Sequence, residues 1–244
     1  MYGEAEAIIG RAVANRRREF VLVSKVVSFD GEASQNRVRD SVRESLRLLR
    51  TDVIDILMVH SAPQAAIKRG DVMEVLQELK REGAIRYIGA SVYGEEAALA
   101  AIEAGSYDCL QVAYSVLDRR PESRLFAAAE TADVGLVARS VLLRGTLTHR
   151  YTLLPGQLSD VKVAVENMAQ LAGGTAMLPE FAYRYVLSHP YLQSALVGAS
   201  SMEELEAAVR FEDLGPLSSE EIARVQALPM PDPFFLNPGN WPAI

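Results

Sequence analysis

The stretch that decides the fold is Asp55-Ile-Leu-Met-Val-His60, a short apolar run that ends in an imidazole. A run this short and this apolar is typical of a buried strand in a parallel sheet. It follows residues 38–49, where apolar side chains recur at helical spacing. Because a βα barrel carries its chemistry at the carboxyl ends of its strands, His60 is a candidate functional residue. A core histidine that closes the strand is the alternative, and this segment alone leaves both open.

Length and composition are those of an ordinary soluble protein. The 244 residues suffice for one large α/β domain or two small ones, and 49% of them are hydrophobic. The formal net charge of -7 argues against a nucleic-acid surface. The single cysteine, Cys109, fits a reducing cytoplasm, where we expect the protein. No apolar run approaches the roughly 18 residues of a membrane span, and the acidic first ten residues do not resemble a signal peptide.

Short apolar runs alternate with amphipathic stretches along the chain. The six expected strands end near Lys25, His60, Ser91, Tyr114, Ser140 and Ala199, and the expected helices span 4–15, 34–50, 72–81, 95–104, 122–131, 161–171, 179–188, 202–211 and 218–228. Repeated units of about 30 residues favour an α/β fold of the (β/α)8 TIM-barrel type. Since a closed barrel has eight strands, six indicate an incomplete one. We predict one domain over residues 1–244, with a C-terminal tail at 229–244.

Seven segments, in order, resemble the aldo-keto reductase superfamily. They are Tyr2-Gly-Glu-Ala-Glu-Ala-Ile-Ile-Gly10, Val23-Ser-Lys25, Asp55-Ile-Leu-Met-Val-His60, Gly89-Ala-Ser91, Gln111, Ser140 with Gly145, and Leu196-Val-Gly-Ala-Ser-Ser201. Each segment is weak by itself, but the ordered set is specific and covers the chain from Met1 to about Val209.

The resemblance implies hydride transfer between NADP(H) or NAD(H) and a small or sugar-like aldehyde or ketone. Tyr2 would protonate the alkoxide oxygen that forms when hydride reaches the carbonyl carbon. Lys25 would tune the pKa of that phenol, and His60 would donate a hydrogen bond to the substrate oxygen. From the residues alone, a lysine at a strand end is more often a surface residue whose ammonium reaches solvent.

The resemblance also implies an extended cofactor across the carboxyl ends of the strands. It assigns the nicotinamide carboxamide to Ser91 and Gln111, and the pyrophosphate to Ser140 with the backbone around Leu142. The other matched cofactor-binding positions are Arg139 beside the nicotinamide ring, the two glycines Gly145 and Gly198, and Ser200 and Glu204 at the adenosine end. Ordinary loop hydrogen bonding is the alternative for each serine.

The sequence departs from the family's pattern at several positions. The family's first two strands, and an Asp ahead of the tyrosine, have no counterpart before Tyr2, and open sheet edges invite pairing with another chain. Arg139 stands where an aromatic residue is usual, although a guanidinium plane also stacks. Glu204 stands near the usual basic partner of the adenosine 2′-phosphate. Because acidic residues accept from a ribose 2′-hydroxyl, we expect NADH to be accepted at least as well as NADPH, unless Arg210 compensates.

Three functions stay open from the sequence. The first is an NAD(P)-dependent carbonyl reductase or alcohol dehydrogenase, as a monomer or homodimer. The second is a relative that binds a nucleotide or a partner without turnover. The third is a subunit that completes its sheet with another chain. Neither His149 nor His189 has acidic or Cys neighbours at ligand spacing, so no metal site is expected.

Overall fold

The computed structural model describes residues 3–27 and 33–242, which form two compact units. Unit 1 takes in residues 1–111 and 128–135, and unit 2 takes in residues 112–127 and 136–244, as far as each is described. The predicted single domain over residues 1–244, with its tail at 229–244, stays a prediction.

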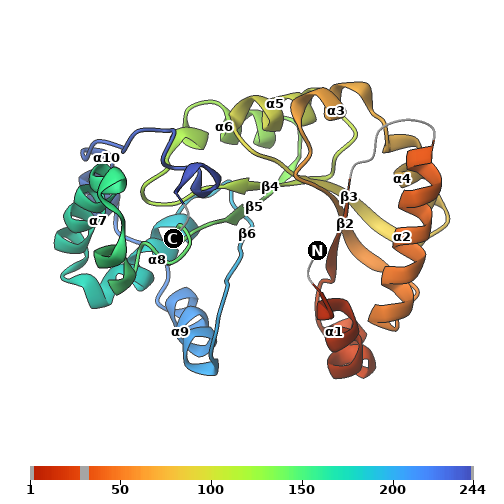
Figure 1. The fold of residues 1–244 in the computed structure, drawn as a ribbon, viewed down its shortest axis with the longest axis horizontal. Helices are drawn as coiled ribbons and strands as arrows, with labels where there is room; N and C mark the ends of the chain where they lie inside the picture. The colour runs from red at the N-terminus through yellow and green to blue at the C-terminus, as the bar shows by residue number, and fades with distance from the viewer. Residues whose placement is uncertain (1–2, 28–32, 243–244) are drawn as a thin grey trace. The chain divides into compact units, whose positions relative to one another are not determined.

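Unit 1 alternates parallel strands with helices (Figure 1). Its elements are α1 (Ala5–Val13), the 3-10 helix η1 (Ala14–Glu19), β1 (Val23–Val27), α2 (Ala33–Leu49), β2 (Ile54–His60), α3 (Gln64–Arg69), α4 (Met73–Arg81), β3 (Ile85–Ser91), α5 (Glu95–Glu103), the start of β4 (Cys109–Ala113) and the end of α6 (Leu125–Thr131). The ladders from β1 to β2, from β2 to β3 and from β3 to β4 are all parallel.

Unit 2 is richer in helix. Beyond the shared parts of β4 and α6, its elements are η2 (Arg120–Glu122), β5 (Gly135–Arg139), η3 (His149–Leu153), η4 (Gly156–Leu158), α7 (Ser159–Ala172), η5 (Thr175–Met177), α8 (Leu178–Leu187), β6 (Ser194–Ala195), α9 (Met202–Asp213), α10 (Ser219–Gln226) and η6 (Pro238–Asn240). Strands β5 and β6 pair in parallel. Helix α10 begins with a capping box, in which Ser218 and Glu221 satisfy each other's backbone N–H groups.

The strand order of the described residues is β1-β2-β3-β4-β5-β6, so sheet order follows chain order. This confirms the predicted α/β class and its six parallel strands. Two predictions of secondary structure were wrong. The strand expected to end near Ala199 keeps only Ser194–Ala195 in the ladder; the Leu196 N–H still donates to the Ala138 carbonyl at 2.8 Å, and residues 197–200 line a cavity instead of continuing the strand. The helix α3 was missed, because six residues between Pro63 and Gly70 are too few to show a helical period.

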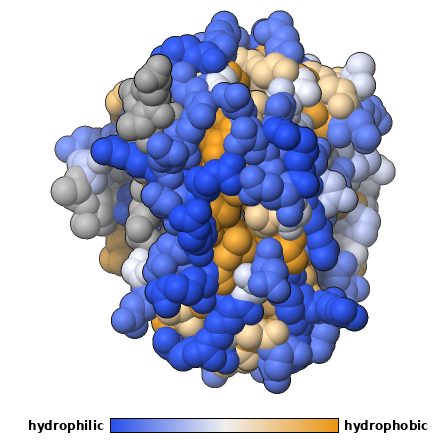
Figure 2. Space-filling model, turned by 90° about the vertical axis from the view of Figure 1, so that its right-hand side faces the viewer, coloured by the Kyte–Doolittle hydropathy of each residue, from blue (hydrophilic) through white to orange (hydrophobic). Residues whose placement is uncertain are grey.

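Helices α2 and α4 pack on one another through an apolar stripe edged by charge. Val38 and Val42 of α2 and Leu76 and Leu79 of α4 are buried. At the rim, the guanidinium of Arg39 pairs with Glu78 at 2.6 Å and with Glu82 at 2.8 Å. Figure 2 shows this side of unit 1 as a mainly hydrophilic surface with apolar residues visible between the charged ones.

The two faces of the unit 1 sheet carry different residues. Val26, Leu57, Ile88 and Leu110 are almost fully buried and share one face, because side chains at alternate positions of a strand point the same way. The other face carries Lys25 on β1, His60 and Ser91 at the ends of β2 and β3, and Gln111 on β4. The register therefore places polar side chains together on one face, near the carboxyl ends of the strands.

The buried carboxylate of Asp55 joins the amino ends of three strands. It accepts a hydrogen bond of 2.7 Å from the backbone N–H of Leu22, just before β1, and it pairs with Arg17 and with Arg86 of β3, each at 2.7 Å. Burial by itself raises the pKa of Asp55, but the Leu22 N–H and the two guanidinium groups outweigh burial and hold that pKa below its ordinary value. The carboxylate is therefore ionised and fully partnered at neutral pH.

We expect Asp55→Asn to lower the free energy of unfolding by about 3 kcal/mol at pH 7, since it leaves two guanidinium groups facing a neutral amide. Because the folded-state pKa lies below the unfolded value of about 3.9, this contribution is present above pH 4 and is lost as the pH falls through the folded-state pKa. Urea unfolding at pH 7 and at pH 3 measures both. As a control, Asp40→Asn removes an exposed pair with Arg43 and should cost less than about 1 kcal/mol. Equal costs for the two variants would contradict the account.

Gly89 of β3 lies where the sheet has no room for a side chain. A Cβ there would come within 2.9 Å of Met58 Cγ on β2 and 3.1 Å of Cys109 Sγ on β4. All three residues lie in one row across the strands, on the face that carries Lys25. The neighbouring side chains therefore leave room only for glycine at position 89.

We predict that Gly89→Ala destabilises the protein by about 1–3 kcal/mol, the usual cost of adding a methyl group to a filled site. Gly156→Ala is the matched control, because nothing lies within 4 Å of its Cβ position. That control should be neutral or slightly stabilising, since alanine narrows the unfolded ensemble. Equal midpoints of denaturant unfolding for the two variants would refute the packing argument.

Candidate functional site

Four of the residues matched by motif lie together on one face of the unit 1 sheet. Lys25 is in register with Met58, two positions before His60, so Lys25 and His60 share a face on neighbouring strands. Extending the ladder from Val59 and Ala90 by one residue puts Ser91 beside His60. Ser91 is itself in register with Gln111. The sequence had separated these residues by up to 86 positions, and the parallel register brings them into two adjacent rows.

Burial differs along this group. Ser91 and Gln111 are each 3% exposed, whereas Lys25 and His60 are half-buried. The Ser91 hydroxyl donates to Gln111 Oε1 over 3.3 Å, which fixes the orientation of the amide. A half-buried ammonium and imidazole next to a fixed, buried amide form a site that can bind and polarise a polar small molecule.

The backbone turns sharply away just after His60. Ser61 has a φ of +51°, a left-handed conformation that a non-glycine residue adopts at some cost. The following residue is anchored, since Ala62 N–H donates to the carbonyl of Ser91. This turn ends β2 at His60, so the imidazole lies at the carboxyl end of the strand.

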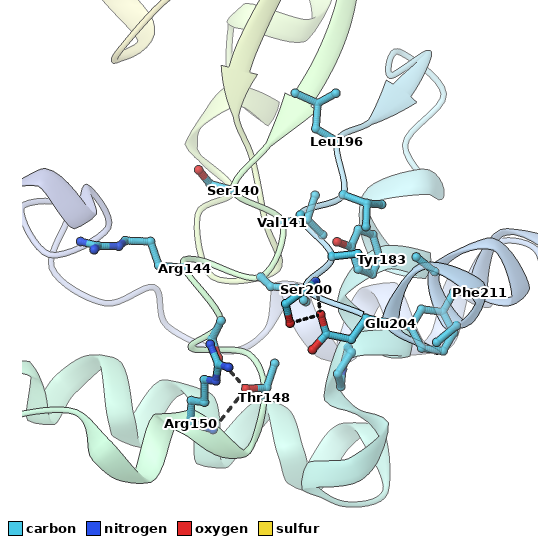
Figure 3. A pocket seen from close by; sticks show the side chains of 18 of the residues that line it. Ser140, Val141, Arg144, Thr148, Arg150, Tyr183, Leu196, Ser200, Glu204 and Phe211 are labelled. Atoms are coloured by element: carbon cyan, nitrogen blue, oxygen red, sulfur yellow. Dashed lines mark hydrogen bonds between the residues drawn. The ribbon is translucent and has the colours of Figure 1, made fainter. Parts of the chain in front are cut away.

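Unit 2 contains a cavity of about 700 Å³ (Figure 3). It is enclosed by the loop after β5, the chain after β6 and parts of α8 and α9. The lining residues are Ser140, Val141, Leu142, Arg144, Gly145, Thr148, His149, Arg150, Pro179, Tyr183, Leu196, Val197, Gly198, Ala199, Ser200, Glu204, Ala207, Ala208 and Phe211. Its volume falls within the range of pockets that hold small molecules or cofactors.

The loop after β5 is held in a rare backbone conformation. Ser140, Leu143 and Arg144 have φ of +62°, +44° and +56°, and Gly145 follows at +82°. Each left-handed L-residue costs on the order of 1–2 kcal/mol, and such strain persists mainly where function requires the shape. Hydrogen bonds hold the loop, among them Leu143 N–H to the Ser140 carbonyl at 2.8 Å and the Thr148 hydroxyl to the Gly145 carbonyl at 2.6 Å.

One anionic side chain lies among these walls. Glu204 Oε2 accepts from the backbone N–H of Ser200 at 2.7 Å and from its hydroxyl at 2.9 Å. The Ser200 N–H, its hydroxyl and the charge of Arg150 hold the pKa of Glu204 below its ordinary value. Ser201 caps α9 by accepting from the Glu204 N–H. The carboxylate is therefore ionised at neutral pH and fixed at the first turn of α9.

Two guanidinium groups also line the cavity. Arg144 and Arg150 are exposed, and the Arg150 side chain passes within 3.6 Å of the Cβ position of Gly145. Arg144 donates to the carbonyl of Pro238 in the tail over 3.4 Å. Guanidinium groups suit phosphate oxygens because their donors match the spacing of those oxygens.

The sequence-predicted cofactor residues fall into two groups. Six of them line the unit 2 cavity: Ser140, Leu142, Gly145, Gly198, Ser200 and Glu204. Arg139 adjoins them, with Nη1 donating to the Ser140 hydroxyl over 3.1 Å. Ser91 and Gln111 lie in unit 1 with the predicted catalytic pair Lys25 and His60. The predicted acid, Tyr2, lies outside the described residues. The roles of all these residues stay predictions.

Sequence reasoning missed several residues that line the cavity. Arg144 adjoins the matched Gly145 and Arg150 follows a few residues later, so a search for cations near that glycine would have found both. Phe211 lies seven residues after Glu204, two helical turns away on the same face. Tyr183 of α8 stacks on Phe211 with ring centroids 6.2 Å apart. This contact joins two helices, so no local sequence pattern predicts it.

Other polar clusters in unit 2 serve the fold. The hydroxyls of Tyr114 and Tyr185 both donate to Glu122 Oε1, at 2.6 and 2.7 Å, inside an aromatic cluster with Phe126. In the loop after β4, Arg120 forms an ion pair with the buried Asp118 at 2.7 Å. In the part of the chain that the structure describes, no group of His, Cys, Asp or Glu side chains is arranged to hold a metal ion.

No helix among the described residues has both the length and the apolar character needed to cross a membrane.

Comparison with known protein families gives one match that spans most of the chain. The model of the Aldo/keto reductase family matches residues 1–229. An uncharacterised oxidoreductase of Bacillus subtilis, YqkF, is 28% identical over 92% of this chain and 79% of its own length. The NADH-specific methylglyoxal reductase of Escherichia coli is 29% identical over 85% of this chain and 74% of its own length.

Solved structures agree with these sequence matches. The holo form of aldo-keto reductase AKR11C1 from Bacillus halodurans aligns with a TM-score of 0.78 and 29% identity, over 91% of this chain and 76% of that one. An aldo/keto reductase from Klebsiella pneumoniae in complex with NADP and acetate aligns with a TM-score of 0.70 and 25% identity, over 94% and 77% of the two chains. The family resemblance expected from the seven segments is confirmed.

Proposed function

Because the chain belongs to the aldo/keto reductase family of NAD(P)-dependent oxidoreductases, we propose that it reduces the carbonyl group of a small aldehyde or ketone. The observation that carries the proposal is the gathering of six matched cofactor positions around one cavity of unit 2. The Escherichia coli relative is named for methylglyoxal and NADH, and the Klebsiella pneumoniae structure for NADP. These names support a short carbonyl compound as substrate and a nicotinamide nucleotide as hydride donor.

The cavity of unit 2 fits the adenosine and diphosphate parts of such a nucleotide. A diphosphate needs cations and N–H donors, and Arg144 and Arg150 line the cavity beside the left-handed loop. An adenine ring needs a flat apolar surface, which Ala207, Ala208 and Phe211 offer on α9. In unit 1, Ser91 and the fixed amide of Gln111 supply the paired donors and acceptors that a carboxamide requires.

The chemistry assigns each remaining residue one task. The nicotinamide, when bound, supplies hydride to the carbonyl carbon, so that the carbonyl oxygen takes up the π electron pair as an alkoxide. Tyr2 gives its phenolic proton to that oxygen, which completes the alcohol. The ammonium of Lys25 stabilises the phenolate that results, and His60 donates a hydrogen bond to the carbonyl oxygen. Both tasks suit half-buried groups, because a partly dry site strengthens their interaction with developing negative charge.

Substitutions of the three proposed catalytic residues should slow turnover and leave nucleotide binding intact. We expect Tyr2→Phe, Lys25→Met and His60→Gln each to lower kcat for methylglyoxal reduction by about 10²–10⁴-fold, the usual contribution of positioned acid–base groups. Loss of absorbance at 340 nm measures turnover, and quenching of NADH fluorescence measures binding. Tyr87→Phe is the control, since Tyr87 is exposed near the amino end of β3. This variant should reduce methylglyoxal at the wild-type rate.

Two results would count against the proposal. Wild-type rates in the Tyr2 and His60 variants would remove both residues from the chemistry. Tight binding of NADH or NADPH with no turnover of short aldehydes by the unaltered chain would instead favour a protein that binds a nucleotide without reducing a carbonyl.

A further inference from the structure

Helix α1 is held to the rest of unit 1 by few apolar contacts. Of its residues, Ala5–Val13, only Gly10 is buried, whereas Ile8 and Ile9 are 52% and 40% exposed. A surface helix usually takes its position from the burial of an apolar face. Because α1 buries so little apolar surface, the specific contacts that it makes decide where it lies.

The first of these contacts is in the middle of the helix, at Gly10. A Cβ at this position would overlap the Leu48 carbonyl oxygen and would come within 2.9 Å of Leu49 Cα, at the end of α2. The two backbones therefore touch there, an approach that only glycine permits. One such contact fixes the distance between the helices, but the helix can still pivot about it.

The second contact is at the first turn of α1. Glu6 Oε1 accepts a hydrogen bond of 2.6 Å from the Ser24 hydroxyl of β1, and both side chains are half-buried. Hydrogen bonds to a carboxylate are short and roughly twice as strong as those between neutral groups. Glu6 and Gly10 are four residues apart, so both contacts lie on one face of the helix. Together they fix the start of α1 as well as its middle.

Ser24 is the residue before Lys25 on β1. Because successive side chains of a strand point to opposite faces, Ser24 shares the buried face of Val26, and Lys25 shares the face of His60. The Ser24 hydroxyl therefore holds α1 on one side of the strand that carries the ammonium on its other side.

The start of α1 follows Tyr2 closely in the chain. Two residues, Gly3 and Glu4, separate Tyr2 from Ala5, where the helix begins. Consecutive Cα atoms are about 3.8 Å apart, so little chain is available to absorb a displacement of the first turn. In the proposed reaction the phenol must reach both the ammonium and the carbonyl oxygen, and a misplacement of about 1 Å can slow a reaction about a hundredfold.

We propose that Glu6 is a positioning residue for the reductase reaction: its hydrogen bond to Ser24 fixes the start of α1, and so the placement of the Tyr2 phenol against the Lys25 ammonium. Glu6 acts through Tyr2 rather than on the reacting atoms. This inference rests on the proposed function, because it takes Tyr2 as the acid and Lys25 as the group that tunes it.

Steady-state reduction of methylglyoxal by variants of the full chain tests the inference. Glu6→Ala and Ser24→Ala should each lower kcat by about 10–100-fold, and the double variant should be no slower than either, because both changes remove the same bond. Glu6→Gln should keep at least about half of the wild-type kcat, since its amide oxygen still accepts from Ser24. Glu4→Ala is the control: it removes a carboxylate at the start of the same helix that makes no capping bond, and it should leave kcat unchanged.

The pH profile of kcat separates positioning from loss of the fold. A phenol farther from an ammonium has a higher pKa, so the alkaline limb of the profile should move to higher pH in Glu6→Ala and Ser24→Ala. The KM for methylglyoxal and the affinity for NADH, measured by fluorescence quenching, should change by less than about threefold. Partial unfolding would instead lower kcat at every pH and leave the limb in place.

The outcomes separate this inference from the proposed function. No reduction of methylglyoxal or other short aldehydes by the unaltered chain would overturn both. If the unaltered chain reduces them and Glu6→Ala does so at the same rate, the reductase proposal stands and the role of Glu6 is overturned. An equal loss in Glu6→Ala and Glu6→Gln, or a loss that leaves the alkaline limb unmoved, would also overturn that role.

Discussion

The buried carboxylate of Asp55 is the interaction on which the geometry of unit 1 depends. It sits on β2 and binds the chain leading into β1 and a guanidinium of β3, so one charge sets three strands against each other at their amino ends. In a parallel sheet, the alignment of the strands at their amino ends also fixes which residues are neighbours at their carboxyl ends. Lys25, His60 and Ser91 share a face near the carboxyl ends because Asp55 fixes this alignment.

The cavity of unit 2 is lined mostly by apolar side chains, and a strained loop and a hydrogen-bonded carboxylate hold its shape. Consecutive left-handed residues turn the chain after β5 back on itself, and hydrogen bonds within the loop hold that turn. Across the cavity, Ser200 and Glu204 hold the chain after β6 against the first turn of α9. The residues that shape the cavity are therefore also those with the most to offer a polar ligand, which is why shape and chemistry coincide there.

The sequence allowed the prediction of what depends on local periodicity. Apolar runs placed five of the six strands closely. The parallel register of those strands then puts Lys25, His60, Ser91 and Gln111 on one face. Features that depend on distant packing were not predictable. Strand β6 is only two residues long, because the chain after it lines the cavity. Tyr183 contacts Phe211 only because α8 packs on α9. The hydrogen bond that fixes the backbone of Glu204 could have been predicted, since Ser201 and Glu204 have the spacing of a helix cap.

The proposed reaction moves a hydride from a nicotinamide to a carbonyl carbon. The most direct measurement uses NADH deuterated at both C4 positions of the nicotinamide as the reductant and methylglyoxal as the substrate, with the alcohol product analysed by mass spectrometry and proton NMR. We expect one deuterium on the carbon atom of the former carbonyl group, in proportion to the NADH consumed. An alcohol without deuterium at that carbon from NADH labelled at both C4 positions, or no alcohol with either NADH or NADPH, would contradict it.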